Sequence, residues 1–215
     1  EYATAQSEYK IDNTKTGAYY YPDFGKAEPV YPSVFKALQA AQPNRGNAAF
    51  AEWNQIVNGI IEPDAGVDTY AVRNISGQSA GFADVADYIL SDAFDNTALL
   101  YFQSDYMDGV GHGSGFYNDN YYAQLKKYDA YFQSIMDALA QKDAVEDTLV
   151  IINSDHGGNG TSHGGTTQAE YDVQLALGGQ TIDSGKRLEG GTNHDPSVIA
   201  LTALRADVPA SMDGS

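Results

Sequence analysis

Asp155, His156 and His163 lie close together in the sequence on two glycine-rich motifs. Asp155 and His156 belong to the stretch SDHGG, and His163 belongs to SHGG a few residues later. Both stretches follow an apolar run at residues 148–152, which predicts a buried strand of a parallel sheet. Open α/β folds place their chemistry at the carboxyl ends of such strands. Carboxylate oxygen and neutral imidazole nitrogen both bind zinc, so the pattern indicates a divalent-metal site.

A second acid and imidazole occur earlier, in the stretch DGVGH. Asp108 and His112 follow an expected strand at residues 98–102, and the glycines would let the backbone turn so that both side chains converge. The chain has only four histidines, and His112, His156 and His163 all lie beside glycine shortly after an expected strand. Histidines without a shared role would be scattered, so we expect these three to act together.

These side chains divide between two ions. A first ion could bind Asp108, His112 and His163. A second could bind Asp155 and His156. Two ions a few ångströms apart would hold the attacking and leaving oxygens of an in-line displacement at phosphorus.

Two roles are possible for Asp105. It could replace Asp108 as a metal ligand, or it could accept a hydrogen bond from the ring N–H of a histidine ligand and so orient that ring. The second ion is short of ligands. No Ser or Thr stands on a recognisable nucleophile elbow near these loops.

The composition limits the partners. Twelve Lys and Arg oppose 29 Asp and Glu, and a net charge of −17 disfavours a nucleic-acid polymer and an anionic membrane. A small phosphate ester stays compatible, because bound cations reverse the local sign. The absence of cysteine removes thiolate sites and disulfides. No apolar run is long enough to span a membrane, and the N-terminus lacks a signal-peptide pattern, so we expect a mature or trimmed chain.

Apolar periodicity predicts a single α/β domain over residues 1–215, with a mostly parallel sheet and helices on both faces. The expected helices cover residues 33–42, 82–90, 125–139 and 196–204, and the expected strands cover residues 48–51, 69–72, 98–102, 148–152 and 171–177.

In their order along the chain, the three motifs resemble those of the alkaline phosphatase superfamily. The branch they look most like is the type I phosphodiesterase/nucleotide pyrophosphatase group. The resemblance extends to YPSVF at residues 31–35, to Trp53, and to the closing segments 193–198 and 208–214. It implies an alkaline-phosphatase-like fold and a hydrolase of phosphoric esters that uses two divalent metal ions, most often zinc.

The resemblance also implies roles for residues. Asp108, His112 and His163 match the ligands of one ion, and Asp155 and His156 match two ligands of the other.

Two further residues, Asn13 and His194, are also candidates for the site. Residues 11–13 resemble the segment just after the family's nucleophile, so Asn13 is a candidate contact for a phosphoryl oxygen, with a turn-forming role as the alternative. His194 is expected near the site or in a structural role.

The family's Thr or Ser nucleophile and a further metal-binding Asp have no counterpart in the sequence. We therefore expect a fragment whose N-terminal strand, acid and nucleophile lie upstream of residue 1, on a segment of the same protein that stays bound. An incomplete record, or a degenerate protein that has lost catalysis, is the alternative.

The expected function is phosphodiesterase, nucleotide pyrophosphatase or phosphatase chemistry on a small phosphate ester. The main alternative is a non-catalytic extracellular structural or interaction protein on the same scaffold, which the tyrosine-rich stretches and acidity favour. A metal-dependent mutase or phosphoethanolamine transferase shares the motifs. We expect an extracellular or secreted protein. Asn74 and Asn159 lie in glycosylation sequons. The sequence leaves open whether the protein forms a homo-oligomer.

Overall fold

The structure is a computed structural model that describes residues 32–53, 56–62, 64–71, 79–187 and 190–214. The chain divides into two compact units, each assembled from segments distant in sequence. Unit 1 contains residues 1–72, 95–103 and 190–215, and unit 2 contains residues 73–94 and 104–189. The expectation of a single domain stays a prediction.

Unit 1 is built on a parallel sheet of three strands. β1 (Gly46–Ala51) lies between β2 (Val67–Ala71) and β3 (Thr97–Gln103), and both pairings are parallel. The sequence of β1 is rich in alanine and has little intrinsic strand preference, yet Ala48 and Ala49 are fully buried. Burial between two neighbours therefore decides its structure, as in the central strands of other parallel sheets.

Two helices of unit 1 begin where capping chemistry predicts. α2 (Val34–Ala41) starts after Ser33, whose hydroxyl accepts the backbone N–H of Lys36 at 3.2 Å. α7 (Asp195–Ala203) has proline in its first turn, where a missing N–H costs nothing. A short helical segment, η2 (Ile56–Ile60), connects β1 to β2.

A small apolar cluster joins these helices. Leu38 of α2 and Leu201 of α7 are almost completely buried and pack with Ala206 and Met212. Close packing of this kind makes the loss of even a few methyl groups costly.

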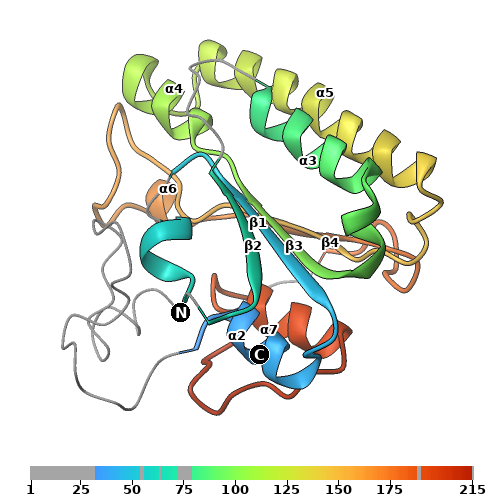
Figure 1. Cartoon of the computed structure of the whole chain (residues 1–215). Helices are drawn as coiled ribbons and strands as arrows, with labels where there is room; N and C mark the ends of the chain where they lie inside the picture. The colour runs from blue at the N-terminus through green and yellow to red at the C-terminus, as the bar shows by residue number, and fades with distance from the viewer. Residues whose placement is uncertain (1–31, 54–55, 63, 72–78, 188–189, 215) are drawn as a thin grey trace. The chain divides into compact units, whose positions relative to one another are not determined.

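Unit 2 consists mainly of helices. Its elements are α3 (Ala80–Leu90), α4 (Tyr106–Ser114), α5 (Asp119–Gln141), β4 (Val150–Asn153), α6 (Gln168–Tyr171) and β5 (Leu175–Gly178), while η3 (Asp92–Asn96) leads from α3 toward β3. α3 and α5 lie side by side (Figure 1), and the ring of Phe82 contacts Tyr128 and Tyr131 at centroid distances of 5.0 and 5.7 Å. None of the helices in the described residues is long and apolar enough to cross a membrane.

The α/β fold class is confirmed, and two local expectations are wrong. The segment after β3 is the helix α4 instead of a glycine-rich loop, because packing against α5 outweighs the low helix propensity of its glycines. The run at residues 148–152 was expected to be a buried parallel strand. Instead β4 pairs antiparallel with β5, and Ile152 is 47% exposed.

Leu38→Ala is expected to destabilise unit 1 by about 2–5 kcal/mol, because a buried side chain is replaced by a cavity. Val208→Ala, at a position 37% exposed, is the control and should change the free energy of unfolding by about 0.5 kcal/mol or less. Chemical denaturation of the purified variants measures both. Equal effects would show that the Leu38 cluster contributes no more than surface contacts.

Candidate metal site

The helix α4 places Asp108 and His112 on one face. Residues four apart in an α-helix lie one above the other, so both side chains point the same way. His112 Nε2 lies 3.3 Å from Asp108 Oδ2. Both side chains are partly exposed, at 31% for Asp108 and 45% for His112. The pair expected from a tight loop is therefore formed by helical spacing.

His163 joins this pair from a distant part of the sequence. Its Nε2 lies 3.4 Å from Asp108 Oδ1, and its ring centroid lies 5.0 Å from that of His112. One ligand atom from each of the three residues falls within 4.8 Å of the other two. In the described residues this is a possible metal site made of one carboxylate and two imidazoles.

The hydrogen bonds around the cluster orient His112. Its Nδ1 lies 2.8 Å from the carbonyl oxygen of Thr161, which can only accept, so we assign the proton to Nδ1. The lone pair of Nε2 then faces the carboxylate of Asp108. Two acceptors that face one another require a cation between them, either a proton or a metal ion.

The environment of Asp108 also calls for a cation. Its Oδ1 is buried and makes no hydrogen bond among the described residues, although the Nε2 of His163 lies beside it. A buried carboxylate oxygen without a hydrogen bond is costly unless a cation compensates it. One carboxylate and two imidazoles also match the donor set of a catalytic zinc site, which keeps a fourth position open. The residues present therefore fit a metal ion.

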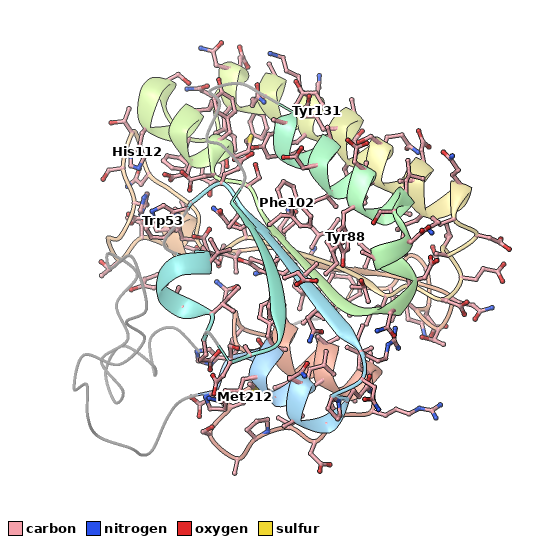
Figure 2. All side chains as sticks on the ribbon, viewed as in Figure 1. Trp53, Tyr88, Phe102, His112, Tyr131 and Met212 are labelled. Carbon is pink, nitrogen blue, oxygen red and sulfur yellow. The ribbon has the colours of Figure 1, made fainter. Side chains whose placement is uncertain are left out.

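Phe116 sets the distance between α4 and the loop that carries His163. A Cβ on Gly111 of α4, or on Gly158 of the loop, would run into the ring of Phe116. Both glycines are thus needed for close approach. The backbone N–H of Phe116 also donates to the carbonyl of Gly160 at 2.8 Å, which ties the end of α4 to the same loop. Figure 2 shows His112 on the side of α4 that faces this loop.

The short helix α6 anchors the other side of the loop. The backbone N–H groups of Gly157 and Gly158 donate to the carbonyls of Glu170 and Ala169, at 2.9 and 3.1 Å. The hydroxyl of Tyr117 donates to the carbonyl of Ala169 at 3.0 Å. A Cβ on Gly157 would clash with that same carbonyl, so glycine is required here for packing.

The carboxylate of Glu170 holds the remainder of the loop. It accepts the hydroxyl of Thr167 at 2.6 Å, and the backbone N–H groups of Gly165 and Thr167 at 2.8 and 3.0 Å. These hydrogen bonds, that from the Thr167 hydroxyl foremost, lower the pKa of Glu170 below its ordinary value of 4.5. The carboxylate therefore fixes the segment just after His163.

An aromatic wall borders the cluster. The ring of Phe116 lies 6.4 Å from that of His163 and 5.6 Å from that of Tyr121. Burial, followed by the neighbouring Tyr117 and the charge of Asp108, raises the pKa of Tyr121. The phenol is therefore held neutral and adds no charge to the site.

Asp155 and His156 lie beside this cluster. The ring of His156 stacks on that of His163 at a centroid distance of 3.8 Å, and its Nε2 lies 3.5 Å from Asp155 Oδ2. His156 Nδ1 donates to the carbonyl of Gly157 at 2.8 Å, which leaves Nε2 with its lone pair. Asp155 is 84% exposed, and the strand before it is not buried as expected, because Ile152 is 47% exposed. Its assignment to a second ion stays a prediction.

Three candidate residues remain, namely Asp105, His194 and Asn13. Asp105 is the residue that precedes α4, and its carbonyl accepts the N–H of Gly109 at 3.3 Å. His194 belongs to unit 1, where it precedes α7 and its N–H donates to the hydroxyl of Thr192 at 3.2 Å. Asn13 lies outside the described residues. The roles expected for these three stay predictions.

Sequence reasoning missed Phe116 and Glu170. Glu170 could have been found, because the stretch TQAE at residues 167–170 has the spacing of a capping box. Phe116 has no such pattern, since its role depends on packing against Gly158, which is distant in sequence.

The comparison with known families decides the identity of the chain. Residues 2–205 match the family described as type I phosphodiesterase / nucleotide pyrophosphatase. The chain belongs to this family.

Solved structures share the fold of this phosphodiesterase-family chain. Ps i-CgsB superposes with a TM-score of 0.63 at 13% identity, covering 99% of this chain and 60% of that chain. The complex of Ps i-CgsB with k-i-k-neocarrahexaose superposes with a TM-score of 0.62 at 14% sequence identity, covering 99% of this chain and 62% of that chain. Leishmania mexicana phosphoglycerate mutase at low cobalt concentration superposes with a TM-score of 0.53 at 14% sequence identity, covering 84% of this chain and 38% of that chain.

These likenesses confirm an alkaline-phosphatase-like fold. This chain spans about 60% of the length of Ps i-CgsB. No curated protein matches the sequence.

Gly158→Ala is expected to weaken metal binding by about 10-fold or more, because the new Cβ pushes the loop with His163 away from Phe116. Gly113→Ala in α4, where a Cβ meets nothing within 4 Å, should leave the affinity unchanged. Isothermal titration with zinc measures both. Unchanged affinity in Gly158→Ala would contradict the packing argument.

Acid is expected to loosen the loop of this family member through Glu170. A lowered folded-state pKa gives stability that is complete above the unfolded-state value and is lost as the pH falls through the folded-state value. Below pH 4.5 the native protein should therefore lose stability more steeply than Glu170→Gln, and at neutral pH it should be the more stable of the two. Thermal unfolding across pH compares them. Parallel curves would exclude this role.

Proposed function

We propose that the protein hydrolyses phosphoric esters with the help of bound divalent metal ions. The observation that carries this proposal is the buried Oδ1 of Asp108, which makes no hydrogen bond in the described residues and lies next to the imidazole of His163. Membership of the phosphodiesterase/pyrophosphatase family supports the reaction type. The substrate class we propose is a small phosphate ester.

Two ions, zinc foremost, are the proposed cofactors. Asp108, His112 and His163 would hold the first, and Asp155 and His156 would contribute to the second. When bound, such ions supply positive charge for the attacking and leaving oxygens of an in-line displacement.

The chain's own residues orient and shield the site. The carbonyl of Thr161 fixes the ring of His112, and the carbonyl of Gly157 fixes that of His156. The rings of Phe116 and Tyr121 restrict water on one side. The nucleophile is proposed to be a Thr or Ser from a part of the protein outside these 215 residues, and Asn13 a contact for the phosphoryl oxygen. An extracellular location is also part of this proposal.

His163→Ala is expected to reduce the zinc retained by the 215-residue chain, because one of three converging ligands is lost. Asp129→Asn, at an exposed acid on α5, is the matched control and should retain the native amount. Elemental analysis after dialysis measures the metal content. Equal metal content in the two variants would remove the basis of the site.

The reaction is tested on the longest product of the same gene with bis(p-nitrophenyl) phosphate. Hydrolysis should stop with a chelator and return with zinc, and His163→Ala should lower kcat/KM by about 100-fold or more. Metal binding without hydrolysis of any phosphate mono- or diester would instead favour the non-catalytic scaffold.

A further inference from the structure

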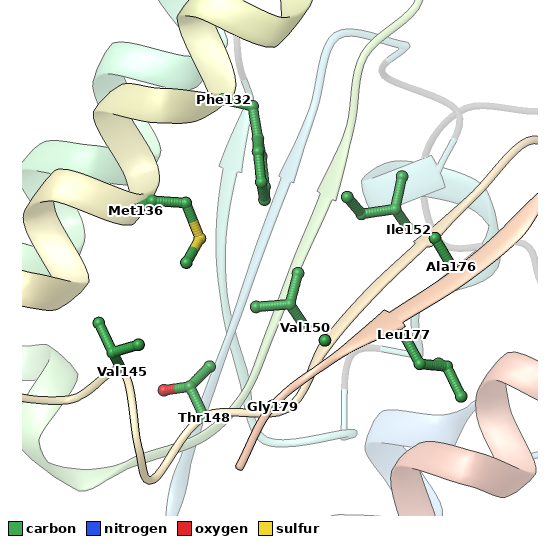
Figure 3. Close-up of a pocket in the computed structure, with 10 residues that line it drawn as sticks. Phe132, Met136, Val145, Thr148, Val150, Ile152, Ala176, Leu177 and Gly179 are labelled. Carbon is green, nitrogen blue, oxygen red and sulfur yellow. The ribbon is translucent and has the colours of Figure 1, made fainter. Parts of the chain in front are cut away.

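The loop that carries His156 starts from a loosely packed strand. β4 ends three residues before His156, and Ile152 near its end is 47% exposed. A cavity of about 250 Å³ lies between β4 and α5, where Phe132 and Met136 point toward Val150 (Figure 3). Close packing is what normally restricts a segment to one position. β4 therefore gives the loop little support, and other contacts must fix the orientation of His156.

His156 has two competing acceptors for its ring proton. Its Nδ1 lies 2.8 Å from the carbonyl oxygen of Gly157, and its Nε2 lies 3.5 Å from Oδ2 of Asp155. A neutral imidazole carries one ring proton, so it donates to one of these acceptors at a time. With the proton on Nδ1, the lone pair of Nε2 is free for a metal ion, whereas a proton on Nε2 would block that atom. A well-placed Gly157 carbonyl thus favours the tautomer of His156 that can bind through Nε2.

A single peptide group carries that carbonyl and is held through its other end. The C=O of Gly157 and the N–H of Gly158 belong to one planar peptide, so a contact that fixes the N–H also fixes the C=O. The N–H of Gly158 lies 3.2 Å from the hydroxyl oxygen of Tyr117 and 3.1 Å from the carbonyl oxygen of Ala169. The Tyr117 hydroxyl itself donates to the carbonyl of Ala169 at 3.0 Å. The phenol therefore holds this peptide against α6.

Tyr117 makes this contact from an unfavourable backbone conformation. It lies in the turn between Gly115, which follows α4, and Asn118, which precedes α5. Its φ is +61°, in the left-handed region that asparagine and glycine adopt at lower cost than a bulky residue. Tyr117 is also 41% exposed, so its ring adds little to the core. What tyrosine offers here, and asparagine does not, is a hydroxyl that reaches the peptide of Gly157 and Gly158. An unfavourable conformation kept beside a candidate site points to a role in that site.

We propose that Tyr117 is a positioning residue that holds His156 in the tautomer with a free Nε2, so that this imidazole can bind the second metal ion. The phenol acts through the peptide that follows His156, and not as a ligand. The first ion depends less on this contact, because Asp108 and His112 lie on α4. The inference rests on the proposed function, in which His156 contributes to the second ion.

NMR of the imidazole nitrogens measures the tautomers directly in the 215-residue chain without metal. Tyr117→Phe removes only the hydroxyl, and it is expected to shift the tautomer ratio of His156 by about 3–10-fold toward the form protonated on Nε2. Tyr122→Phe, at a residue of α5 that is 48% exposed, is the matched control and should leave the ratio unchanged. An unchanged ratio in Tyr117→Phe would overturn the proposal.

His112 is the internal reference in the same spectra. Its Nδ1 faces a different acceptor, the carbonyl of Thr161, so its tautomer should stay the same in Tyr117→Phe. An equal shift at His112 and His156 would indicate a general loosening of the loop and would overturn the specific role of the hydroxyl.

Tyr117→Asn separates the hydroxyl from the backbone conformation. Asparagine adopts a positive φ more readily than tyrosine, so the turn between α4 and α5 should form at lower cost. The variant is nevertheless expected to show the same shift in the His156 tautomer as Tyr117→Phe, because it also lacks the phenol. A native tautomer ratio in Tyr117→Asn would assign the effect to the backbone and overturn the proposal.

Metal uptake connects the positioning role to the proposed function. Cobalt(II) is titrated into the longest product of the same gene and followed by its visible absorption. Tyr117→Phe is expected to weaken binding of the second ion by about 10-fold and to change the affinity for the first by less than about 2-fold. Equal weakening of both ions would overturn the assignment of Tyr117 to His156. If the native protein binds a single ion, the two-ion function fails, and the tautomer ratio still decides the role of Tyr117.

Discussion

The contact between the carboxylate of Asp108 and the two imidazoles governs the structure around it. Asp108 Oδ1 is buried without a hydrogen bond in the described residues, and both Nε2 atoms lie within 3.4 Å of the carboxylate. The carboxylate of Asp108 and the Nε2 of His112 both accept hydrogen bonds, so they cannot be brought together cheaply without a cation. The surrounding loop and helix must therefore supply the energy to hold them, and this explains the density of backbone hydrogen bonds around His163.

The packing of the Phe116 ring against two glycines, together with hydrogen bonds to α6, holds these groups in place. Phe116 fits between Gly111 and Gly158, and the loop is fastened on its far side to α6 by the backbone and carboxylate of Glu170. Glycine is needed at these two positions because the ring leaves no space for a Cβ. The site is thus positioned by tight packing on one side and hydrogen bonds on the other, so that His163 has little freedom to move away from Asp108.

The sequence could identify the cluster but not the elements that form it. Asp108, His112 and His163 were recognisable because three of the chain's four histidines lie beside glycine shortly after an expected strand. Helix α4 was not, because three glycines in nine residues lower helix propensity and only packing against α5 overcomes it. The exposure of Asp155 was also unpredictable, since it depends on what covers the strand before it.

That strand shows why local pattern and burial can disagree. The apolar composition of a strand indicates the environment in which that strand is stable. Its exposure instead depends on which neighbouring segments cover it. In unit 1, β1 has two neighbours, and even its alanines are fully buried; in the described residues of unit 2, β4 has one neighbour, and Ile152 stays 47% exposed. The residues of β4 are the better strand formers of the two. The contrast therefore reflects what covers the two strands, and a strand that is apolar throughout is most stable when both of its faces are covered.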